Sequence, residues 1–265
     1  HPAAAARHPR HGSAHGNIMS EEKRRFVLVD GHSLAYRAYF ALPVDMATSA
    51  GQTTNAVYGF LSMFIKILED LHPYGLVVAF DKGPPSHRLE QFEEYKAHRP
   101  PMPDELQEQI RLIGALLDEM GVVQLGMEGY EADDVLATLA LRIAGEGDEA
   151  LIVTSDKDMM QLVGENIKVV ANRKGLTDVV IFDRDRVLEK FGVPPERIPD
   201  FLALKGDASD NVPGVPGIGD KTAAGLIKQH GGIEQIYGSL DEMKDERVRR
   251  RLEDGRERAM LGLQL

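Results

Sequence analysis

Three short apolar runs in this chain each end in an aspartate. The runs are Phe26–Asp30, Leu76–Asp81 and Leu151–Asp156, and segments with a helical spacing of apolar residues separate them. Short apolar runs between helical segments are typical of buried strands in a parallel sheet. The carboxyl ends of such strands meet at one edge, where ligands gather. The pattern therefore predicts three aspartates close together at one edge of a sheet.

The segments around these runs predict the other elements. A helix begins after Asp30, and the apolar positions of 54–71 form one helical face until His72-Pro73 ends the pattern. Asp104 is expected to cap the next helix. The expected helices lie at 31–37, 54–71, 104–120 and 131–144, and further strands at 122–125, 167–170 and 179–181. This alternation predicts an α/β fold with a central, mainly parallel sheet flanked by helices.

Other stretches break this alternation. Residues 82–103 contain five prolines and little apolar content, which indicates an excursion over the edge of the sheet. From about Gly192 the chain becomes helical with turn signals, so we expect a core domain at 21–192 and a helical lobe at 193–265. Residues 1–20 are rich in alanine, histidine, proline and glycine and lack an apolar signal-peptide region, so we expect a disordered tail or a cloning remnant.

The composition narrows the class of protein. The 265 residues include no cysteine, which excludes disulfides and thiolate metal sites and fits a reducing cytoplasm. No apolar stretch approaches the roughly 20 residues of a membrane span. The formal net charge of −11 alone argues against a nucleic-acid partner. Without the nine acids discussed below the charge is −2, so a near-neutral scaffold with local basic patches can hold DNA or RNA.

Further acids occur in closely spaced groups. Taken singly, each group has an ordinary explanation as a helix N-terminus, a strand-to-helix corner or a capped turn. Residues three apart share a helix face, so Glu131 and Asp134 should point together. Asp133 lies about 200° from Glu131 on an ideal helix and is expected to bind a metal less directly. These groups are Glu131, Asp133 and Asp134, then Asp156 with Asp158, and Asp207 with Asp210.

With the strand-terminal aspartates, these groups give nine carboxylates. Crowded carboxylates repel one another and need cations. Because the chain offers no thiolate, the suitable cations are oxygen-loving divalent ions such as Mg²⁺ or Mn²⁺. Two or more such ions favour a hydrolytic site of the two-metal kind. The expected metal ligands are Asp30, Asp81, Glu131, Asp133, Asp134, Asp156, Asp158, Asp207 and Asp210.

Four motifs, at 29–37, 129–137, 154–158 and 206–219, carry a resemblance. They read VDGHSLAYR, GYEADDVLA, TSDKD and GDASDNVPGVPGIG. Over about 26–265 the chain resembles the 5′-nuclease domain of bacterial DNA polymerase I and its wider kin, the flap endonucleases. The resemblance implies a PIN-like nuclease core, a helical arch at 82–103 and a C-terminal helix–hairpin–helix lobe. It also implies two metal groups, one near Asp30, Asp81, Glu131, Asp133 and Asp134, the other near Asp156, Asp158, Asp207 and Asp210.

The resemblance assigns roles to basic and aromatic residues as well. Arg88, Lys96 and Arg99 lie in the arch, where Lys96 and Arg99 match basic positions that steer the phosphate. With Asp134, these two are the expected catalytic residues. Tyr36 matches an aromatic residue that stacks on a nucleobase. Without the resemblance, the basic segment would be a solvated loop and Tyr36 a core tyrosine.

The glycine-rich run at 214–222 nearly spells a P-loop. Asp220 would face the nucleotide phosphates, however, and no strand precedes the run, so we reject ATP binding. A hairpin whose glycines approach a phosphate closely, before a helix N-terminus, fits better and would hold duplex backbone without reading sequence. The alternative is a plain glycine turn. The resemblance implies a K⁺ ion on the hairpin carbonyls. The expected DNA-binding residues are Tyr36, Arg88, Lys96 and Arg99 in and near the arch, and Gly214, Gly217, Gly219, Lys221 and Thr222 in the hairpin.

These features predict a structure-selective 5′ nuclease, acting as exonuclease and flap endonuclease in Okazaki-fragment maturation and DNA repair. The expected substrates are branched or flapped DNA and RNA-primed DNA. We expect a cytoplasmic, nucleoid-associated monomer, with a polymerase domain in cis or in trans. Two alternatives stay open. A PIN-type RNase would lack the hairpin lobe, and a catalytically silent DNA-junction-binding module would tolerate lost acids, of which none is missing.

Overall fold

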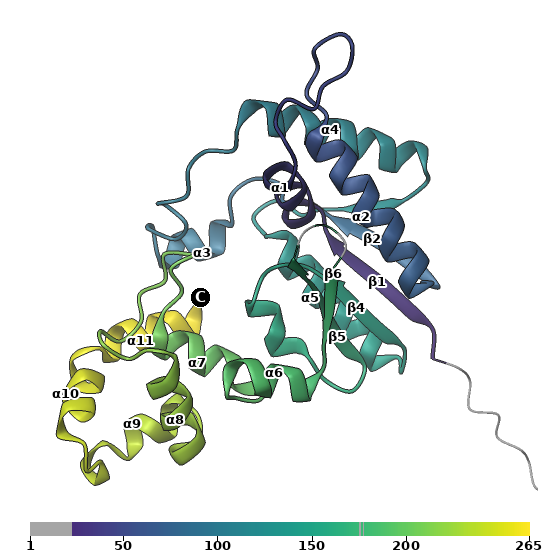
Figure 1. The fold of residues 1–265 in the computed structure, drawn as a ribbon. Helices are drawn as coiled ribbons and strands as arrows, with labels where there is room; N and C mark the ends of the chain where they lie inside the picture. The colour runs from purple at the N-terminus through teal and green to yellow at the C-terminus, as the bar shows by residue number, and fades with distance from the viewer. Residues whose placement is uncertain (1–22, 175, 177) are drawn as a thin grey trace, which may run out of the picture.

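A computed structural model describes residues 23–174, 176 and 178–265, so the tail expected at 1–20 lies outside the described residues. These residues form a sheet of β1 (Arg25–Asp30), β2 (Gly75–Ala79), β3 (Val123–Leu125), β4 (Glu149–Val153), β5 (Ile167–Lys174) and β6 (Asp178–Phe182). The order is β3-β2-β1-β4-β5-β6 (Figure 1). Neighbours run parallel except β5 and β6, which are antiparallel. The predicted mainly parallel sheet is confirmed.

The central strand β1 explains why the apolar runs are continuous. Its Val27 and Val29 point to the first face of the sheet and its Leu28 to the second, and all three are buried. Leu28 lies in register with Val77 of β2 and Ile152 of β4. Because both faces are covered, every position of such a strand is apolar, whichever way it points.

Helices cover both faces (Figure 1). They include α1 (Gly31–Ala41), α2 (Asn55–Leu71) and α4 (Asp104–Glu119) on the first face and α5 (Ala132–Gly145) on the second. Helix α2 ends as predicted, because His72 adopts a left-handed conformation (φ 46°) directly before Pro73. The predicted Asp104 cap is wrong. Pro103 precedes α4, and Asp104 is its first residue without a side-chain capping bond.

The segment 82–103 crosses the carboxyl edge of the sheet. The structure describes it in full, and the one helix in it is α3 (Ser86–Gln91). Turns follow at 93–99, where Lys96 has a positive φ of 56°. Most of the expected helical arch is therefore non-helical in this structure.

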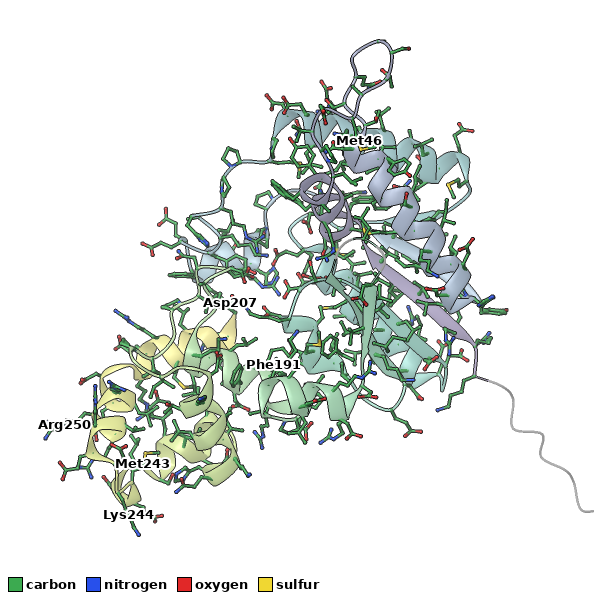
Figure 2. All side chains as sticks on the ribbon, in the orientation of Figure 1. Met46, Phe191, Asp207, Met243, Lys244 and Arg250 are labelled. Carbon is green, nitrogen blue, oxygen red and sulfur yellow. The ribbon has the colours of Figure 1, made fainter. Side chains whose placement is uncertain are left out.

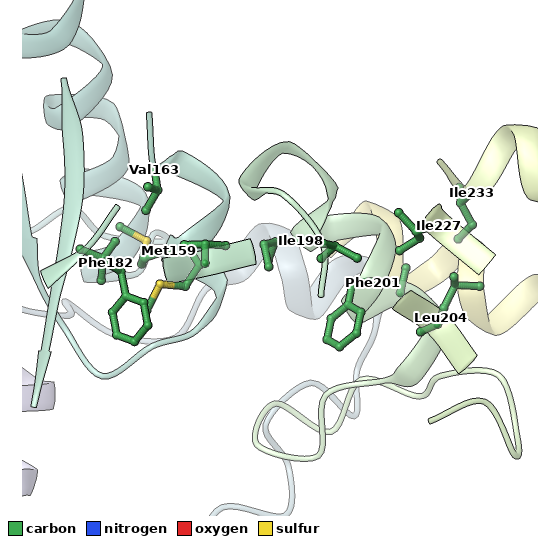
Figure 3. Close-up of a cluster of buried hydrophobic side chains, with 14 of the residues drawn as sticks. Met159, Val163, Phe182, Ile198, Phe201, Leu204, Ile227 and Ile233 are labelled. Atoms are coloured by element: carbon green, nitrogen blue, oxygen red, sulfur yellow. The ribbon is translucent and has the colours of Figure 1, made fainter. Parts of the chain in front are cut away.

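The C-terminal lobe shares a core with the second face of the sheet. Buried side chains run from Met159 and Phe182 beside the sheet to Phe201, Ile227 and Ile233 in the lobe (Figure 3). This continuous packing fixes the lobe against the sheet. No described helix has the length and apolar character needed to cross a membrane. The remaining helices are α6 (Arg184–Phe191), α7 (Ile198–Lys205), α8 (Asp220–His230), α9 (Ile233–Gly238), α10 (Glu246–Asp254) and α11 (Arg256–Gln264), with 3₁₀ turns at Asp158–Leu162, Pro195–Arg197 and Leu240–Glu242.

Candidate active site

Asp30 ends β1 and caps α1. Its carboxylate accepts hydrogen bonds from the Ser33 N–H (2.9 Å) and from Thr154 Oγ1 (3.0 Å). The side chain is buried, and burial, together with the nearby Asp81 and Asp156 carboxylates, raises the pKa of Asp30 to about 6. The end of the central strand therefore holds an acid whose charged form is poorly stabilised by the protein alone.

Asp81 lies just beyond β2 and is fixed by two backbone contacts. Its N–H donates to His32 Nδ1 (3.1 Å), and its carboxylate accepts from the Ala132 N–H (2.6 Å). Burial lowers the pKa of His32. Because Nδ1 accepts a hydrogen bond, the imidazole is neutral and carries its proton on Nε2. These contacts tie α1, β2 and α5 together at the carboxyl edge.

Glu131 and Asp134 lie at the start of α5, Glu131 just before the helix and Asp134 in its first turn. Glu131 is the N-cap, and its N–H donates to Asp134 Oδ2 (2.9 Å). Arg88 contacts both residues, at 3.0 Å from Glu131 Oε2 and 2.8 Å from each oxygen of Asp134. Burial alone would raise the pKa of Asp134, but the hydrogen bonds from Arg88 bring it below its usual value. As expected, the two acids point the same way.

Asp133 faces the acidic cluster, although the helical wheel placed it about 200° from Glu131 and led us to expect less direct metal binding. Glu131 has extended backbone (φ −83°, ψ 160°) and lies outside the helix, so an angle counted from it has no meaning. Asp133 Oδ1 is buried without a hydrogen-bond partner. Burial, and then the Asp30 and Asp156 carboxylates, raise the pKa of Asp133 well above its usual value.

A second group of acids follows β4. Oxygen atoms of Asp156, Asp158 and Asp210 lie within 4.8 Å of one another. Asp158 donates its N–H to Asp156 Oδ1 (2.8 Å), and its own Oδ1 is buried without a partner. Burial, and then the charges of Asp156 and Asp207, raise the pKa of Asp158 to about 8. Such a cluster is what a divalent cation would neutralise.

Asp207, which Figure 2 labels, belongs to the same region. It has its own cation among the described residues. Lys157 Nζ lies 2.5 Å from Asp207 Oδ1, and the Ser209 N–H donates to the same oxygen (2.9 Å). Burial would raise the pKa of Asp207, but the Lys157 hydrogen bond outweighs it, and the pKa is below its usual value. The protein itself therefore neutralises the negative charge of this carboxylate.

Three residues of the 82–103 segment lie on the acidic cluster. The buried Tyr95 hydroxyl lies 2.9 Å from both Glu131 Oε2 and Asp210 Oδ2. Lys96 Nζ contacts Glu131 Oε1 and lies 3.4 Å from Asp210 Oδ2. Arg99 Nη2 lies 2.5 Å from Asp210 Oδ1. Both predicted phosphate-steering cations therefore contact carboxylates here, and Tyr95 is a contact that the sequence did not single out.

The nine carboxylates thus fall into two kinds. Lysine or arginine side chains contact Glu131, Asp134, Asp207 and Asp210. Among the described residues, no ion pair reaches the other five acids, apart from the 3.5 Å approach of the neutral His32 to Asp81. Two oxygens of these five acids lack any partner. Besides Asp81, these five acids are Asp30, Asp133, Asp156 and Asp158. Hard divalent ions, which prefer oxygen ligands, fit such a set of donors.

Two openings lead to these acids. A cavity of about 640 Å³ has Asp133 and Asp156 on one side and Tyr36 and Phe40 on another. A second cavity of about 350 Å³ reaches the same two aspartates from the side of α11. Phe40, one helical turn after Tyr36, was missed at the sequence level, although its spacing of four residues was visible. The acids therefore lie between a large entrance with aromatic walls and a smaller one.

The glycine hairpin lies in the lobe and follows Asp207 and Asp210 closely in the chain. A Cβ on Gly214 would lie 2.2 Å from the Lys205 carbonyl carbon, and Gly217 has a positive φ of 79°. Gly219 is the N-cap of α8, without a side-chain bond to the free N–H groups. The Gly217 carbonyl accepts from Arg251 Nη1 (2.9 Å). Lys221 and Thr222 follow in the first turn of α8, where their N–H groups are available to a ligand.

Comparison with known proteins gives a consistent result. Residues 25–192 match the family model of the 5′–3′ exonuclease, N-terminal resolvase-like domain, and residues 193–265 match that of the 5′–3′ exonuclease, C-terminal SAM fold. The chain is 43% identical over 244 residues to DNA polymerase I of Bacillus subtilis, covering 92% of this chain and 28% of that protein. It is 44% identical over 247 residues to thermostable DNA polymerase I of Thermus filiformis, covering 93% and 29%. The chain therefore spans less than a third of these curated relatives.

Solved structures share the fold. Bacteriophage T5 5′-exonuclease with bound zinc has a TM-score of 0.74 at 23% identity, over 91% of this chain and 88% of that one. The T5 flap endonuclease in a pseudo-enzyme–product complex with DNA and metal ions gives the same values. The catalytic core of Rad2 in complex with DNA substrate has a TM-score of 0.57 at 19% identity, over 89% and 72%.

Proposed function

The chain belongs to the 5′–3′ exonuclease family, and from this premise we propose that it is a structure-selective 5′ nuclease acting at flaps and free 5′ ends. One observation carries the proposal. Four acids at the carboxyl edge of the sheet, one buried and three half-buried, have no ion pair with a cation among the described residues, and two of them each have one buried oxygen without a partner. A DNA-binding module without catalysis has no use for such a costly arrangement. The four are Asp30, Asp133, Asp156 and Asp158.

Mg²⁺ or Mn²⁺ ions would be held by these four residues, with the other five of the nine carboxylates around them. Bound there, a pair of divalent ions supplies an activated water and charge stabilisation for the departing oxygen. The chain's own residues hold the carboxylates in place. Thr154 orients Asp30, and the Ala132 N–H orients Asp81. Metal binding requires these acids to be deprotonated, so their raised pKa values make uptake pH-dependent.

Lys96 and Arg99 are positioned to attract the scissile phosphate. Both reach into the large cavity, where they now contact Glu131 and Asp210. A phosphate that enters between these cations and the acids would take over part of those ion pairs. Arg88 has a different place, because it is held by Asp134. We therefore propose that Arg88 orders the segment and that Lys96 and Arg99 meet the DNA.

The hairpin and the cavity wall support a branched substrate. Gly214 to Gly219 and the N-terminus of α8, with Lys221 and Thr222, would hold duplex backbone. Tyr36 on the wall of the large cavity would stack on a base of the strand to be cut. A K⁺ ion on the hairpin would need carbonyls other than that of Gly217, which Arg251 occupies.

The cellular setting is also a proposal. The curated relatives are DNA polymerases I of more than three times the matched length, which supports a polymerase region in cis. Flapped and RNA-primed DNA would then be the substrates during Okazaki-fragment maturation and repair. We propose that the chain acts as a monomer on DNA of the nucleoid in the cytoplasm.

The test is cleavage of a labelled 5′-flap DNA with Mg²⁺, with EDTA, and by the Asp158→Asn variant. We expect cleavage near the junction with Mg²⁺ only, and a loss of at least a hundredfold in the variant. Asp241→Asn, which changes an acid of the lobe far from the cluster, serves as the control and should cleave normally. Binding without any cleavage by the unmodified protein would favour a silent junction-binding module. Cleavage of single-stranded RNA in preference to the flap would favour a PIN-type RNase.

A further inference from the structure

Phe40, in the last turn of α1, is the most exposed large apolar side chain among the described residues, at 72%. A single exposed apolar side chain is ordinary and by itself indicates no ligand. The surroundings of Phe40 are what distinguish it. Its ring lies on the wall of the cavity of about 640 Å³ that also contains Asp133, Asp156 and Tyr36.

The ring of Phe40 is held in a defined orientation. It is nearly parallel to Tyr36, with a centroid distance of 6.2 Å and an interplanar angle of 23°. Tyr39 packs against it edge-on, at 5.2 Å and 86°. The helix is fixed as well, because α1 approaches α2 so closely that a Cβ on Gly59 would lie 2.8 Å from Ala38 Cβ. Two aromatic rings on a rigid helix therefore present a preformed surface.

The charges in the same cavity indicate what this surface binds. Lys96 and Arg99 line it together with the two rings. Cations that follow a phosphate backbone, combined with aromatic faces on which bases stack, are the usual means of holding single-stranded nucleic acid. A lipid tail or an apolar peptide would match the rings but would offer no anionic group to Lys96 and Arg99. A nucleotide strand satisfies both.

The helix geometry gives the order of the contacts. Asp30 caps α1, Tyr36 follows six residues later and Phe40 ten residues later. With a rise of 1.5 Å per residue, Phe40 lies about 6 Å farther from the acids than Tyr36 along the helix axis. We infer that Phe40 is a second base-stacking residue, which binds the nucleobase next to the one on Tyr36 on the side away from the acids. The inference rests on the proposed function and extends it by one nucleotide.

A coupling experiment tests this assignment. Flap DNAs are prepared with one abasic site at successive positions around the junction, and their Kd values are measured in Ca²⁺ for the unmodified protein and for Phe40→Leu. On intact DNA the variant should bind about fivefold to thirtyfold more weakly, the lower part of the range for base–aromatic stacking because leucine keeps some apolar contact. At one abasic position, the loss of affinity from Phe40→Leu and the loss from the missing base should not add, because both remove the same stacking contact. For Tyr36→Leu, the same non-additive effect should appear at the adjacent abasic position, nearer the cleaved bond.

Further variants serve as controls. Tyr58 is 59% exposed on α2 and lies outside the cavity, so Tyr58→Leu should bind like the unmodified protein. Phe40→Trp keeps an aromatic face and should restore the affinity. Because Phe40 is exposed, the unfolding temperature of Phe40→Leu should stay unchanged, which separates a binding defect from a folding defect.

Each other outcome overturns the inference in a distinguishable way. If the unmodified protein cuts the flap but Phe40→Leu binds every DNA equally well, the role of Phe40 is wrong and the proposed function stands. If the unmodified protein neither binds nor cuts the flap, both fail together. If sedimentation shows a dimer that Phe40→Leu dissociates, a second copy of the chain covers the ring, and the stacking role is wrong.

Discussion

Arg88 and Asp134 form a two-pronged ion pair, with Nη1–Oδ2 and Nη2–Oδ1 distances of 2.8 Å each. The pair uses both oxygens of Asp134, and the Glu131 N–H adds a third bond. The neighbouring Asp133 is the opposite case, because its Oδ1 is buried without a partner. Adjacent acids in one helical turn thus differ in kind, since one is satisfied by the protein and the other is open to a metal.

The first prediction concerns this difference. Asp133→Asn should reduce the affinity for Mn²⁺ at least tenfold, because it removes a charge from the uncompensated cluster. Asp134→Asn should keep most of the Mn²⁺ affinity and most of the flap binding, yet lose most Mg²⁺-dependent turnover. Its amide nitrogen would face the donors of Arg88 and disturb the start of α5. Isothermal calorimetry with Mn²⁺ and single-turnover cleavage measure the two effects.

A matched control is Asp118→Asn, which changes an acid of α4 that hydrogen-bonds Gln124 outside the cluster. It should alter neither metal affinity nor turnover. Equal losses of Mn²⁺ affinity in Asp133→Asn and Asp134→Asn would contradict the division between paired and open acids.

The second prediction concerns the hydroxyl of Thr154. It donates to Asp30 Oδ2 (3.0 Å) and accepts from the Asp156 N–H (3.1 Å), so one buried group links the acids of two strands. Thr154→Val should cost about 1–3 kcal/mol of unfolding free energy, because it leaves a buried N–H unpaired. It should also weaken Mn²⁺ binding, and Thr154→Ser should restore both. Thr138→Val, which removes an exposed hydroxyl bonded to its own helix, should leave both unchanged.

The sequence predicted the arrangement of the site better than its local contacts. The meeting of Asp30 with Asp156 follows from the apolar runs, since a parallel sheet must bring the ends of its strands together. The strand bounds follow less closely, because β2 and β4 end at Ala79 and Val153, before Asp81 and Asp156. The orientation of Asp133 did not follow, because it depends on whether Glu131 stands inside or just before the helix. The contacts of Tyr95 were also hidden. They join residues 36 and 115 positions apart, and no periodic pattern encodes a loop that folds back over an acidic edge.

The third prediction concerns pH. Without metal, burial raises the pKa of Asp30 to about 6 and that of Asp158 to about 8, whereas unfolded aspartates titrate near pH 4. Between these values the folded state binds protons that the unfolded state releases. The metal-free protein should therefore lose stability as the pH rises from about 5 to 8.5. Thermal unfolding in EDTA should show a fall of several degrees over this range.

One variant and one condition check the direction of this pH dependence. Asp158→Asn should flatten the upper part of the fall, because the group that titrates there is gone. Saturating Mn²⁺ should also remove the fall and should bind more tightly as the pH rises, because protons compete for the same oxygens. Asp207 changes the stability with pH in the opposite direction. Because its pKa is lowered, its ion pair and the stability that it contributes are lost only in acid. A metal-free protein that becomes more stable between pH 5 and 8.5 would contradict the prediction.

The fourth prediction concerns competition between Lys96 and the metal. Lys96 Nζ contacts Glu131 and lies 3.4 Å from Asp210, two of the nine candidate ligands. Lys96→Met should raise the Mn²⁺ affinity severalfold, because the competing charge is removed, while it lowers flap cleavage. Lys168→Met, which removes a cation paired with Glu149 away from the cluster, should change neither. Unchanged Mn²⁺ affinity in Lys96→Met would show that Lys96 does not compete for these oxygens.

The fifth prediction separates two glycines of the hairpin. Gly217 has φ 79°, and a Cβ there would lie 2.8 Å from the Arg251 guanidinium carbon, so Gly217→Ala should cost about 1–2 kcal/mol and displace Arg251. Gly219 has an ordinary φ of −104° and nothing within 4 Å of an added Cβ, so Gly219→Ala should keep the unfolding temperature.

Gly219→Ala is expected to affect DNA binding, although it leaves the stability unchanged. If a phosphate backbone approaches the N-terminus of α8, the added methyl group lies in its path, and Gly219→Ala should weaken duplex binding without any loss of stability. Gly225, inside α8 and equally open, provides the matched control, because Gly225→Ala should stabilise the helix and leave duplex affinity unchanged. Thermal unfolding and a salt titration of duplex Kd measure both properties. Full duplex affinity in Gly219→Ala would mean that no phosphate approaches there, and the hairpin would then be the plain glycine turn.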